Sequence, residues 1–185
     1  MHALSPRVVT EFCKLCGWAS DVWRSHVHLF DENPRLQELL QSRAGPALRR
    51  LAIVSHEYAL LQIVKLHDKA VVAGQATLSI DYILSYGAWP QPVLSRLKDL
   101  AAKLDDFAAG LRAARNKIVS HNDLAATLSQ APLGAFAKGV DLEYFKVLQD
   151  FVDVVYGEVI GGPYPFGHYV PTDVGELLSC IRVVE

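Results

Sequence analysis

The sequence is poor in cysteine, with three cysteines in 185 residues. Small secreted domains that depend on disulfides carry many more, and an odd number cannot pair completely within one chain. Without such cross-links a fold must rely on an apolar core, and a chain of this length can bury a sizeable one. We therefore expect a protein of a reducing compartment, the cytoplasm.

Long apolar runs are also missing. No uninterrupted apolar stretch reaches the roughly 18 residues that a membrane span needs. The opening Met-His-Ala-Leu-Ser-Pro lacks the basic segment and apolar run of a secretory signal. No membrane partner is expected.

The chain as a whole has no large excess of charge of one sign, since its formal net charge is −2. This excludes a polycation that coats nucleic acid. The charge is nevertheless unevenly placed, because residues 141–185 hold eight acidic and two basic residues. An anionic partner is therefore expected to meet the first three quarters of the chain, whose balance is positive.

The strand pattern of alternating apolar and polar residues is absent, and apolar residues recur instead at steps of three and four. The longest such series continues for more than seven helical turns. A near-heptad series of this kind packs against another helix at a shallow angle, as in helical bundles. Its members are Val93, Leu97, Leu100, Leu104, Phe107, Leu111, Ala114 and Ile118.

Three further long helices are predicted by the same periodicity. Ser5 followed by Pro6 is typical of a helix start, and Gly45-Pro46 marks another. These helices are expected to end near residues 30 and 66, and the last long helix covers 141–160. The residues predicted to face inward in the second of them are Leu48, Leu51, Val54, Tyr58 and Leu61.

Shorter helices are expected at 34–43, 79–86 and 172–183, and residues 68–75 are expected to form a loop. No repeat, low-complexity tract or linker interrupts the chain. The pattern predicts an all-α helical bundle of four main helices plus short helices. It also predicts a single domain, residues 1–185, that includes the acidic helices of 141–185.

Cys13-x2-Cys16, followed by His26-x-His28, suggests a zinc or redox site. All four residues fall in one predicted helix, where 13 residues at ~1.5 Å rise separate Cys13 from His26 by ~20 Å. Tetrahedral zinc ligands must all lie within about 2.0–2.3 Å of one ion. No metal site is therefore predicted, and Cys16 is expected in the core.

Two histidine–acid pairs and an aromatic loop are further candidates. His56-Glu57 and His67-Asp68 are adjacent pairs, which point in different directions on a helix. His67 is expected at a helix end, where the helix dipole favours a histidine, while Asp68 could alternatively orient a catalytic group on the longest helix. Aromatic residues in 164–169 either stack on a base or fold over the core.

The end of the longest helix combines basic residues with a histidine. Arg112, Arg115 and Lys117 occur there, and no acidic residue lies between Asp106 and Asp123. This segment is expected to meet an anion.

Arg115 and His121 each lie three residues from Ile118, so they flank the apolar face by about 60° on either side. A cation and an imidazole at the edge of a buried face need partners. Either they cap the helix and pair with acids such as Asp68 or Asp123, or they line a cleft. The sequence leaves both alternatives open.

The segment Arg115-Asn116-x4-His121 resembles the signature motif of HEPN domains: an arginine, a polar residue, a short spacer and a histidine. The continuation to Asp123 resembles the abortive-infection branch of that superfamily, and so does the upstream run 63–80. The resemblance covers roughly residues 45–125. It implies an HEPN-like bundle that dimerises through the motif face.

The resemblance further implies an endoribonuclease that uses no metal ion or other cofactor, with an active site shared by two protomers. Arg115 and His121 would be catalytic, assisted by Asn116, because histidine exchanges protons near neutral pH and arginine binds phosphate oxygens. Arg112 and Lys117 would contact the RNA backbone, and Asp68 or Asp123 would orient the catalytic groups.

Single-stranded or loop RNA, a second copy and a cognate antitoxin protein are the expected partners of such a toxin or phage-defence effector. The alternatives are a non-catalytic HEPN-like module that binds nucleotide, RNA or protein, and a structural bundle in which the Arg–His pair is a satisfied cap.

Overall fold

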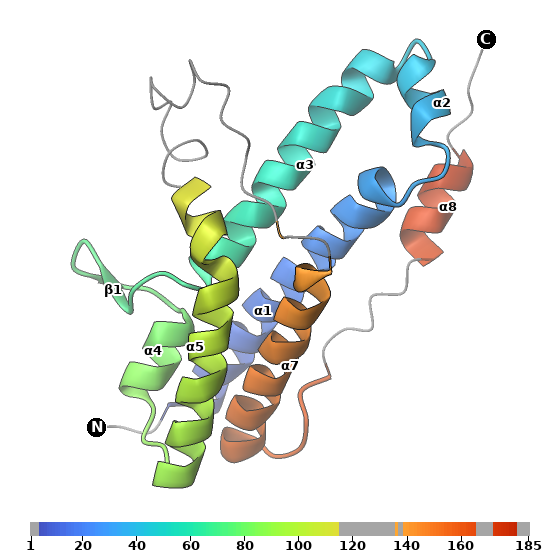
Figure 1. The fold of residues 1–185 in the computed structure, drawn as a ribbon. Coiled ribbons are helices and arrows are strands. Elements are labelled where there is room, and N and C mark those ends of the chain that lie inside the picture. Colours follow the sequence, from blue (N-terminus) through green and yellow to red (C-terminus); the bar gives the residue numbers. More distant parts are fainter. Residues whose placement is uncertain (1–3, 115–135, 137–138, 166–171, 181–185) are drawn as a thin grey trace.

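The structure is a computed structural model, and it describes residues 4–114, 136, 139–165 and 172–180 (Figure 1). The predicted all-α class is confirmed. None of the helices within those ranges is long and apolar enough to cross a membrane.

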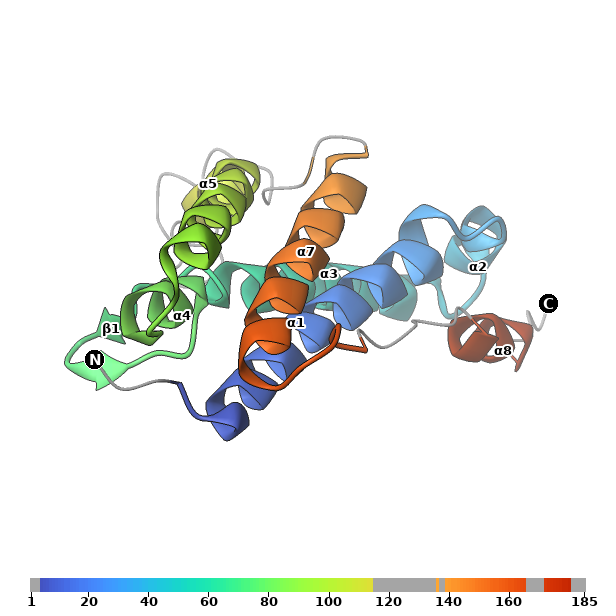
Figure 2. The ribbon, with the colours of Figure 1, turned by 90° about the horizontal axis from the view of Figure 1, so that it is seen from below.

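Four long helices build the fold: α1 (Pro6–His26), α3 (Gly45–Lys65), α5 (Gln91–Ala114) and α7 (Val140–Val159). α1 packs against both α3 and α7, and α5 packs against α7. Figure 2 shows α7 between α5 and α1. The four main helices predicted from the sequence are therefore present, and their predicted starts are close to the observed ones.

Local signals in the sequence explain several helix starts. The Ser5 hydroxyl accepts a hydrogen bond from the Val8 amide at 3.3 Å, and Pro6 occupies the first turn of α1. The Ser79 hydroxyl accepts from the Tyr82 amide at 3.2 Å at the start of α4 (Ile80–Tyr86). Each hydroxyl satisfies an amide that has no partner within its helix.

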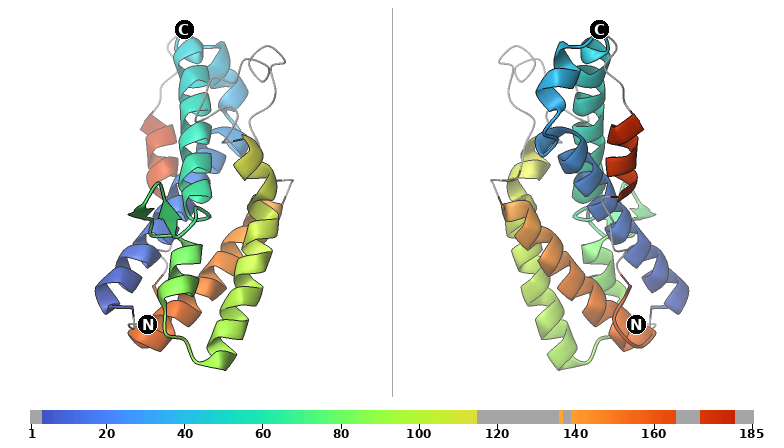
Figure 3. Two further views of the ribbon diagram at one scale, coloured as in Figure 1. Left: turned by 90° about the vertical axis from the view of Figure 1, so that its left-hand side faces the viewer. Right: turned by 90° about the vertical axis from the view of Figure 1, so that its right-hand side faces the viewer.

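Shorter elements complete the described chain. α1 continues into a π-helix, η1 (Val27–Asp31), which α2 (Leu36–Gln41) follows. α8 (Thr172–Cys180) contacts η1. Figure 3 shows α3 and α5 on the near side of its left-hand view, in front of α1 and α7.

Residues 68–75, predicted to be a loop, contain part of a small hairpin instead. β1 (Val71–Val72) pairs antiparallel with β2 (Gln75–Ala76). The two residues between them, Ala73 and Gly74, both have positive φ, at 50° and 79°. A two-residue turn with positive φ matches the twist of a hairpin, and glycine is suited to it. Strands of two residues are too short to produce a period-two pattern, so the prediction was wrong here.

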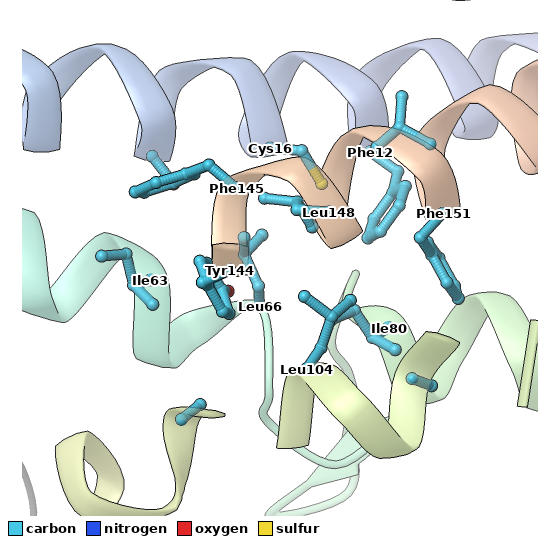
Figure 4. Packing of buried hydrophobic residues seen from close by; sticks show 14 of the residues in the cluster. Phe12, Cys16, Ile63, Leu66, Ile80, Leu104, Tyr144, Phe145, Leu148 and Phe151 are labelled. Carbon is cyan, nitrogen blue, oxygen red and sulfur yellow. The ribbon is translucent and has the colours of Figure 1, made fainter. Parts of the chain in front are cut away.

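The core lies where α1, α3, α5 and α7 meet (Figure 4). Phe12 of α1 packs edge-on against Phe151 of α7, with ring centroids 6.0 Å apart. Leu104 of α5 and Leu148 of α7 are fully buried beside them. The apolar series predicted for the first, third and fourth long helices therefore face this core in the described residues.

The inward face predicted for α3 was wrong at three of its five residues, whereas Leu48 and Leu61 are partly buried. Leu51, Val54 and Tyr58 are exposed by 57%, 60% and 44%. The buried residues of α3 come from its other side: Gly45, Ala59, Leu60, Ile63 and Val64. Both sides of α3 are apolar, so periodicity alone could not decide which of them faces the core.

Two leucines of α7 test the packing of the core. Leu148 is fully buried, whereas Leu142 is 71% exposed. We expect Leu148→Ala to lower the free energy of unfolding by about 2–5 kcal/mol, because it removes buried methylenes and leaves a cavity. Leu142→Ala should change it by less than about 0.5 kcal/mol. Urea titration followed by circular dichroism measures both, and equal effects would contradict the packing.

A pair of histidines, of which His26 is buried and His56 partly buried, joins α1 to α3. His26 lies 3.3 Å through Nδ1 from the Ser55 hydroxyl and 3.2 Å through Nε2 from Nδ1 of His56. Its Nε2 is also 3.9 Å from an Asp31 carboxylate oxygen. Burial lowers the pKa of His26 and His56 acts in the same direction, while Asp31 opposes them.

This environment predicts a loss of stability in acid. Between the folded and unfolded pKa values of His26, the unfolded chain binds more protons than the folded one, so the folded state loses stability as pH falls below about 6.5. His26→Gln should reduce the difference in unfolding free energy between pH 7 and pH 5. His28→Gln, at a partly exposed site in η1, is the control. Equal pH dependence in wild type and His26→Gln would contradict this account.

Candidate functional site

The predicted motif follows directly after α5. Arg115, Asn116, Lys117, His121 and Asp123 lie outside the residues that the structure describes. The next residue back, Ala114, is the last of α5. The structure therefore describes the helix that leads to the motif and the groups that hold this helix in place.

α5 is held by the apolar series predicted for it. Leu97, Leu104 and Leu111 are exposed by no more than 1%. They recur every seven residues. The partly buried Leu100 and Phe107 lie between them on the same series, and the partly buried Val93 precedes them. The series is confirmed as far as Leu111. Arg112, predicted to contact RNA, lies on the last turn of α5, and its side chain is outside the described part.

Asp68, the predicted orienting acid, lies just beyond the end of α3 and is half-buried. Its backbone amide donates to the Lys65 carbonyl at 3.2 Å, which ends the helix with a tight turn. The same turn directs the preceding side chain, His67, toward α5. Asp68 therefore lies in the turn that ends α3, next to the residue that contacts α5.

His67 connects three helices. Its Nδ1 is 2.8 Å from an Asp105 carboxylate oxygen on α5, and its Nε2 is 2.9 Å from the Tyr144 hydroxyl on α7. The side chains of His67 and Tyr144 are fully buried, whereas that of Asp105 is half-exposed. We call these three residues the histidine clasp.

The chemistry of the clasp follows from its donors and acceptors. A carboxylate only accepts, so Nδ1 of His67 must carry a proton for Asp105. In the neutral ring Nε2 is then an acceptor, and the Tyr144 hydroxyl donates to it. Because their side chains are buried, His67 and Tyr144 serve to position α5.

The sequence pattern did not reveal the clasp. The helix dipole was expected to stabilise His67, and Asp68 was expected to be the group that acts toward the longest helix. Asp105 follows Leu104 of the buried series, and Tyr144 precedes Phe145 of the α7 face. A polar residue beside a buried series is a weak signal, since many such residues are simply exposed.

The cysteines behave as core residues. Cys13 and Cys16 are both fully buried. Burial, with the nearby charge of Asp153, raises the pKa of Cys13 to about 12, and burial raises the pKa of Cys16 as well. Among the described residues no group of three or more His, Cys, Asp or Glu side chains could hold a metal ion. Core packing of Cys16 is confirmed.

The thiols of Cys13 and Cys16 should be unreactive in the folded protein. Alkylation requires the thiolate and access to it. We expect iodoacetamide at pH 8 to modify Cys180, which is exposed, and to leave Cys13 and Cys16 unmodified until the chain is unfolded. Intact-mass measurement counts the adducts. Rapid addition of two or three adducts to the native protein would contradict the packing of α1.

The described start of the aromatic loop lies against α7. The Tyr164 amide donates to an Asp153 carboxylate oxygen at 3.1 Å, and its ring packs edge-on against Tyr156, with centroids 5.1 Å apart. Tyr164 therefore belongs with the fold. Residues 166–169 of this loop are outside the described part.

A comparison with models of protein families assigns the chain to a family. The family model for AbiU2-type HEPN domains matches residues 6–177, which run from the start of α1 into α8. The chain belongs to this abortive-infection HEPN family. Neither a curated protein nor a solved structure matches it at a significant level.

The extent of the HEPN match matters for the site. It includes all four long helices, the three clasp residues and the motif Arg115-Asn116-x4-His121. The motif therefore lies inside the matched HEPN region and directly follows a helix that packs on both α3 and α7.

Proposed function

We propose that this HEPN protein is an endoribonuclease that needs no metal ion and acts as a toxin or phage-defence effector. The observation that carries the proposal is the position of Arg115-Asn116-x4-His121. An arginine, an amide and an imidazole follow directly after the longest helix, within the region that matches the abortive-infection HEPN family.

The residues suit phosphodiester cleavage. Attack of a ribose 2′-oxygen on the adjacent phosphorus forms one P–O bond and breaks the bond to the 5′-oxygen, which gives a 2′,3′-cyclic phosphate and a 5′-hydroxyl. The step needs a base for the 2′-hydroxyl proton and an acid for the leaving oxygen. Imidazole serves both needs near neutral pH.

The second requirement is a group that stabilises the negative charge on the phosphate. The transition state crowds negative charge on the phosphate oxygens, and a guanidinium donates two parallel hydrogen bonds to such oxygens. Arg115 takes this role, and Asn116 orients the phosphate or the imidazole. Arg112 and Lys117 bind the RNA backbone through salt-sensitive contacts.

Two protomers complete the site in this proposal. One His121 accepts the proton while His121 of the partner subunit donates one, so that each imidazole starts in the protonation state that its step requires. The histidine clasp contributes indirectly, because it fixes α5 and therefore the point at which the motif begins. Asp68 and Asp123 are the proposed orienting acids.

The proposal is tested by incubating the purified protein with single-stranded RNA in EDTA. We expect cleavage by the wild type and a loss of about 10²–10⁴-fold in rate for His121→Ala, the size typical of a missing general acid–base. Arg115→Ala should lose about 10²–10³-fold, as when an electrostatic donor is removed. Arg96→Ala, an exposed arginine on the same helix, is the matched control and should retain the wild-type rate.

The product chemistry gives a second readout. A substrate with a single 2′-deoxyribose at the cleaved position should resist cleavage at that bond, because the nucleophile is missing. Wild-type protein that binds RNA but leaves it intact would contradict the proposal and favour a non-catalytic RNA-binding HEPN module. Cleavage by His121→Ala at the wild-type rate would contradict the assigned role of His121.

A further inference from the structure

A cavity of about 310 Å³ is lined by residues of η1, α2, α3 and α8 and of the turn between η1 and α2. Figure 1 shows α2 and α8 at the end of the molecule where α3 begins. Eight of the ten lining residues are leucine or phenylalanine, the other two are Asn33 and Ser55, and none of the ten is charged. Small-molecule pockets are mostly apolar, hold a few polar groups and have volumes from about 300 Å³ upward. The cavity has the size and the lining of such a pocket.

The cavity has a buried interior and an exposed rim. Phe30 and Leu39 line it and are only 9% and 2% exposed. Leu51 of α3 and Leu177 of α8 also line it, yet they are 57% and 52% exposed. These two leucines therefore form a rim between α3 and α8, through which a ligand can reach the interior from solvent.

One wall of the cavity is formed by the π-helix. In η1 the Glu32 amide donates to the Val27 carbonyl at 2.8 Å, five residues back, so the turn is wider than that of an α-helix. Leu29 and Phe30 of this turn both line the cavity. Single π-turns are rare and occur frequently at functional sites. The π-turn is thus an independent sign that this region binds something.

Asn33, the first of the two polar lining residues, is engaged within its own turn. Its Nδ2 donates to the Leu29 carbonyl at 3.0 Å, and its Oδ1 accepts from the Arg35 amide at 2.9 Å. Both ends of the Asn33 amide therefore stabilise the wall. Ser55 on α3 is the polar lining residue that is left to meet a ligand.

The Ser55 hydroxyl lies between the cavity and His26. Its oxygen is 3.3 Å from Nδ1 of His26, and burial lowers the pKa of His26, so this ring is neutral at pH 7. Nε2 of the ring is 3.9 Å from an Asp31 carboxylate oxygen and 3.2 Å from Nδ1 of His56. The negative charge of Asp31 favours the tautomer with the proton on Nε2. Nδ1 then accepts from the Ser55 hydroxyl, and the Ser55 oxygen keeps lone pairs that can accept from a ligand.

We propose that the cavity binds a small uncharged molecule with an apolar body of about two fused rings and one hydroxyl group, which donates to the Ser55 oxygen. The volume sets the size of the apolar body. A cavity of about 150 Å³ lined by leucine, isoleucine and phenylalanine stays dry and binds benzene, and the cavity beside Ser55 has about twice that volume.

The lining separates this ligand from the substrate of the proposed ribonuclease site. RNA and nucleotides carry charged phosphates, and burying a charge without a partner is costly. None of the lining residues could pair with a phosphate, because none is charged. The inference therefore goes beyond the ribonuclease proposal, and it rests on the cavity and not on the motif 115–121.

Isothermal titration calorimetry of the full chain with 2-naphthol, which has two fused rings and one hydroxyl, tests the cavity. We expect a dissociation constant on the order of 10–100 μM, within the range for a ligand of this size. 2-Naphthoate has a carboxylate on the same rings and should bind about 10-fold or more weakly, because its charge would be buried without a partner.

NMR of protein with methyl-labelled leucine locates the bound ligand. 2-Naphthol should shift the methyl signals of Leu36, Leu39 and Leu48, which line the cavity. The methyl signals of Leu104 and Leu148 in the main core should not move, and they serve as the internal control.

Ser55→Ala tests the hydrogen bond to the ligand. It should weaken binding of 2-naphthol by about 3–10-fold, the size of one lost hydrogen bond, and leave binding of naphthalene within about 2-fold of wild type. Ser20→Ala is the matched control, because Ser20 is a buried serine of α1 that does not line the cavity. It should bind both molecules as the wild type does. Circular dichroism confirms that both variants are folded.

Several results would overturn the inference. They are no detectable binding of 2-naphthol at about 1 mM, methyl shifts confined to the main core, and 2-naphthoate binding as tight as that of 2-naphthol. A Ser55→Ala variant that keeps full affinity for 2-naphthol, or that loses affinity equally for naphthalene, would contradict the role of Ser55. RNA cleavage is measured separately without ligand, so its absence contradicts the ribonuclease proposal alone.

Discussion

The histidine clasp is the interaction on which the arrangement of the helices depends. Apolar contacts hold α3, α5 and α7 together, but such contacts are not directional and tolerate small shifts along a helix. The hydrogen bonds that join His67 to Asp105 and Tyr144 to His67 are directional. Burying an imidazole and a phenol requires that their polar atoms be satisfied. A shift of one helix against the others would break these bonds, so the clasp sets the register of all three.

The register of α5 matters because the motif begins at the residue after this helix. Asp105 lies nine residues before Ala114, the last residue of α5, a distance of about 14 Å along a helix. The buried leucines on both sides of Asp105 hold the rest of the helix against its neighbours. The clasp and the leucines together fix where the chain enters the segment 115–121. In the proposed ribonuclease site, where an arginine and an imidazole would be positioned around one phosphate, a small misplacement would lower the rate.

The sequence predicted the helices better than it predicted which side of each helix is buried. The series on α1, α5 and α7 correctly indicated the buried faces, although Leu15 and Trp18 of α1 and Leu142 of α7 are apolar and exposed. In α3 the same reasoning chose Leu51, Val54 and Tyr58, which are exposed. Periodicity indicates that a helix has an apolar side. It does not indicate what that side packs against.

In the candidate site, too, the sequence predicted some residues and missed others. The motif 115–121 is contiguous in sequence, so its residues were predicted directly, and the family match of residues 6–177 includes it. The clasp joins positions 67, 105 and 144, which come together only when three helices pack. None of the three carries a local signal, since a histidine at a helix end has an adequate local explanation. Long-range polar contacts of this kind need the fold before they can be recognised.

The most direct test of the clasp is a double-mutant cycle between His67 and Asp105. The free energy of unfolding is measured for wild type, His67→Gln, Asp105→Asn and the double variant. If the clasp joins α3 to α5, the two substitutions should be coupled by about 1 kcal/mol, allowing for the solvent exposure of Asp105. Strictly additive effects would contradict it, because the two side chains would then contribute to stability independently.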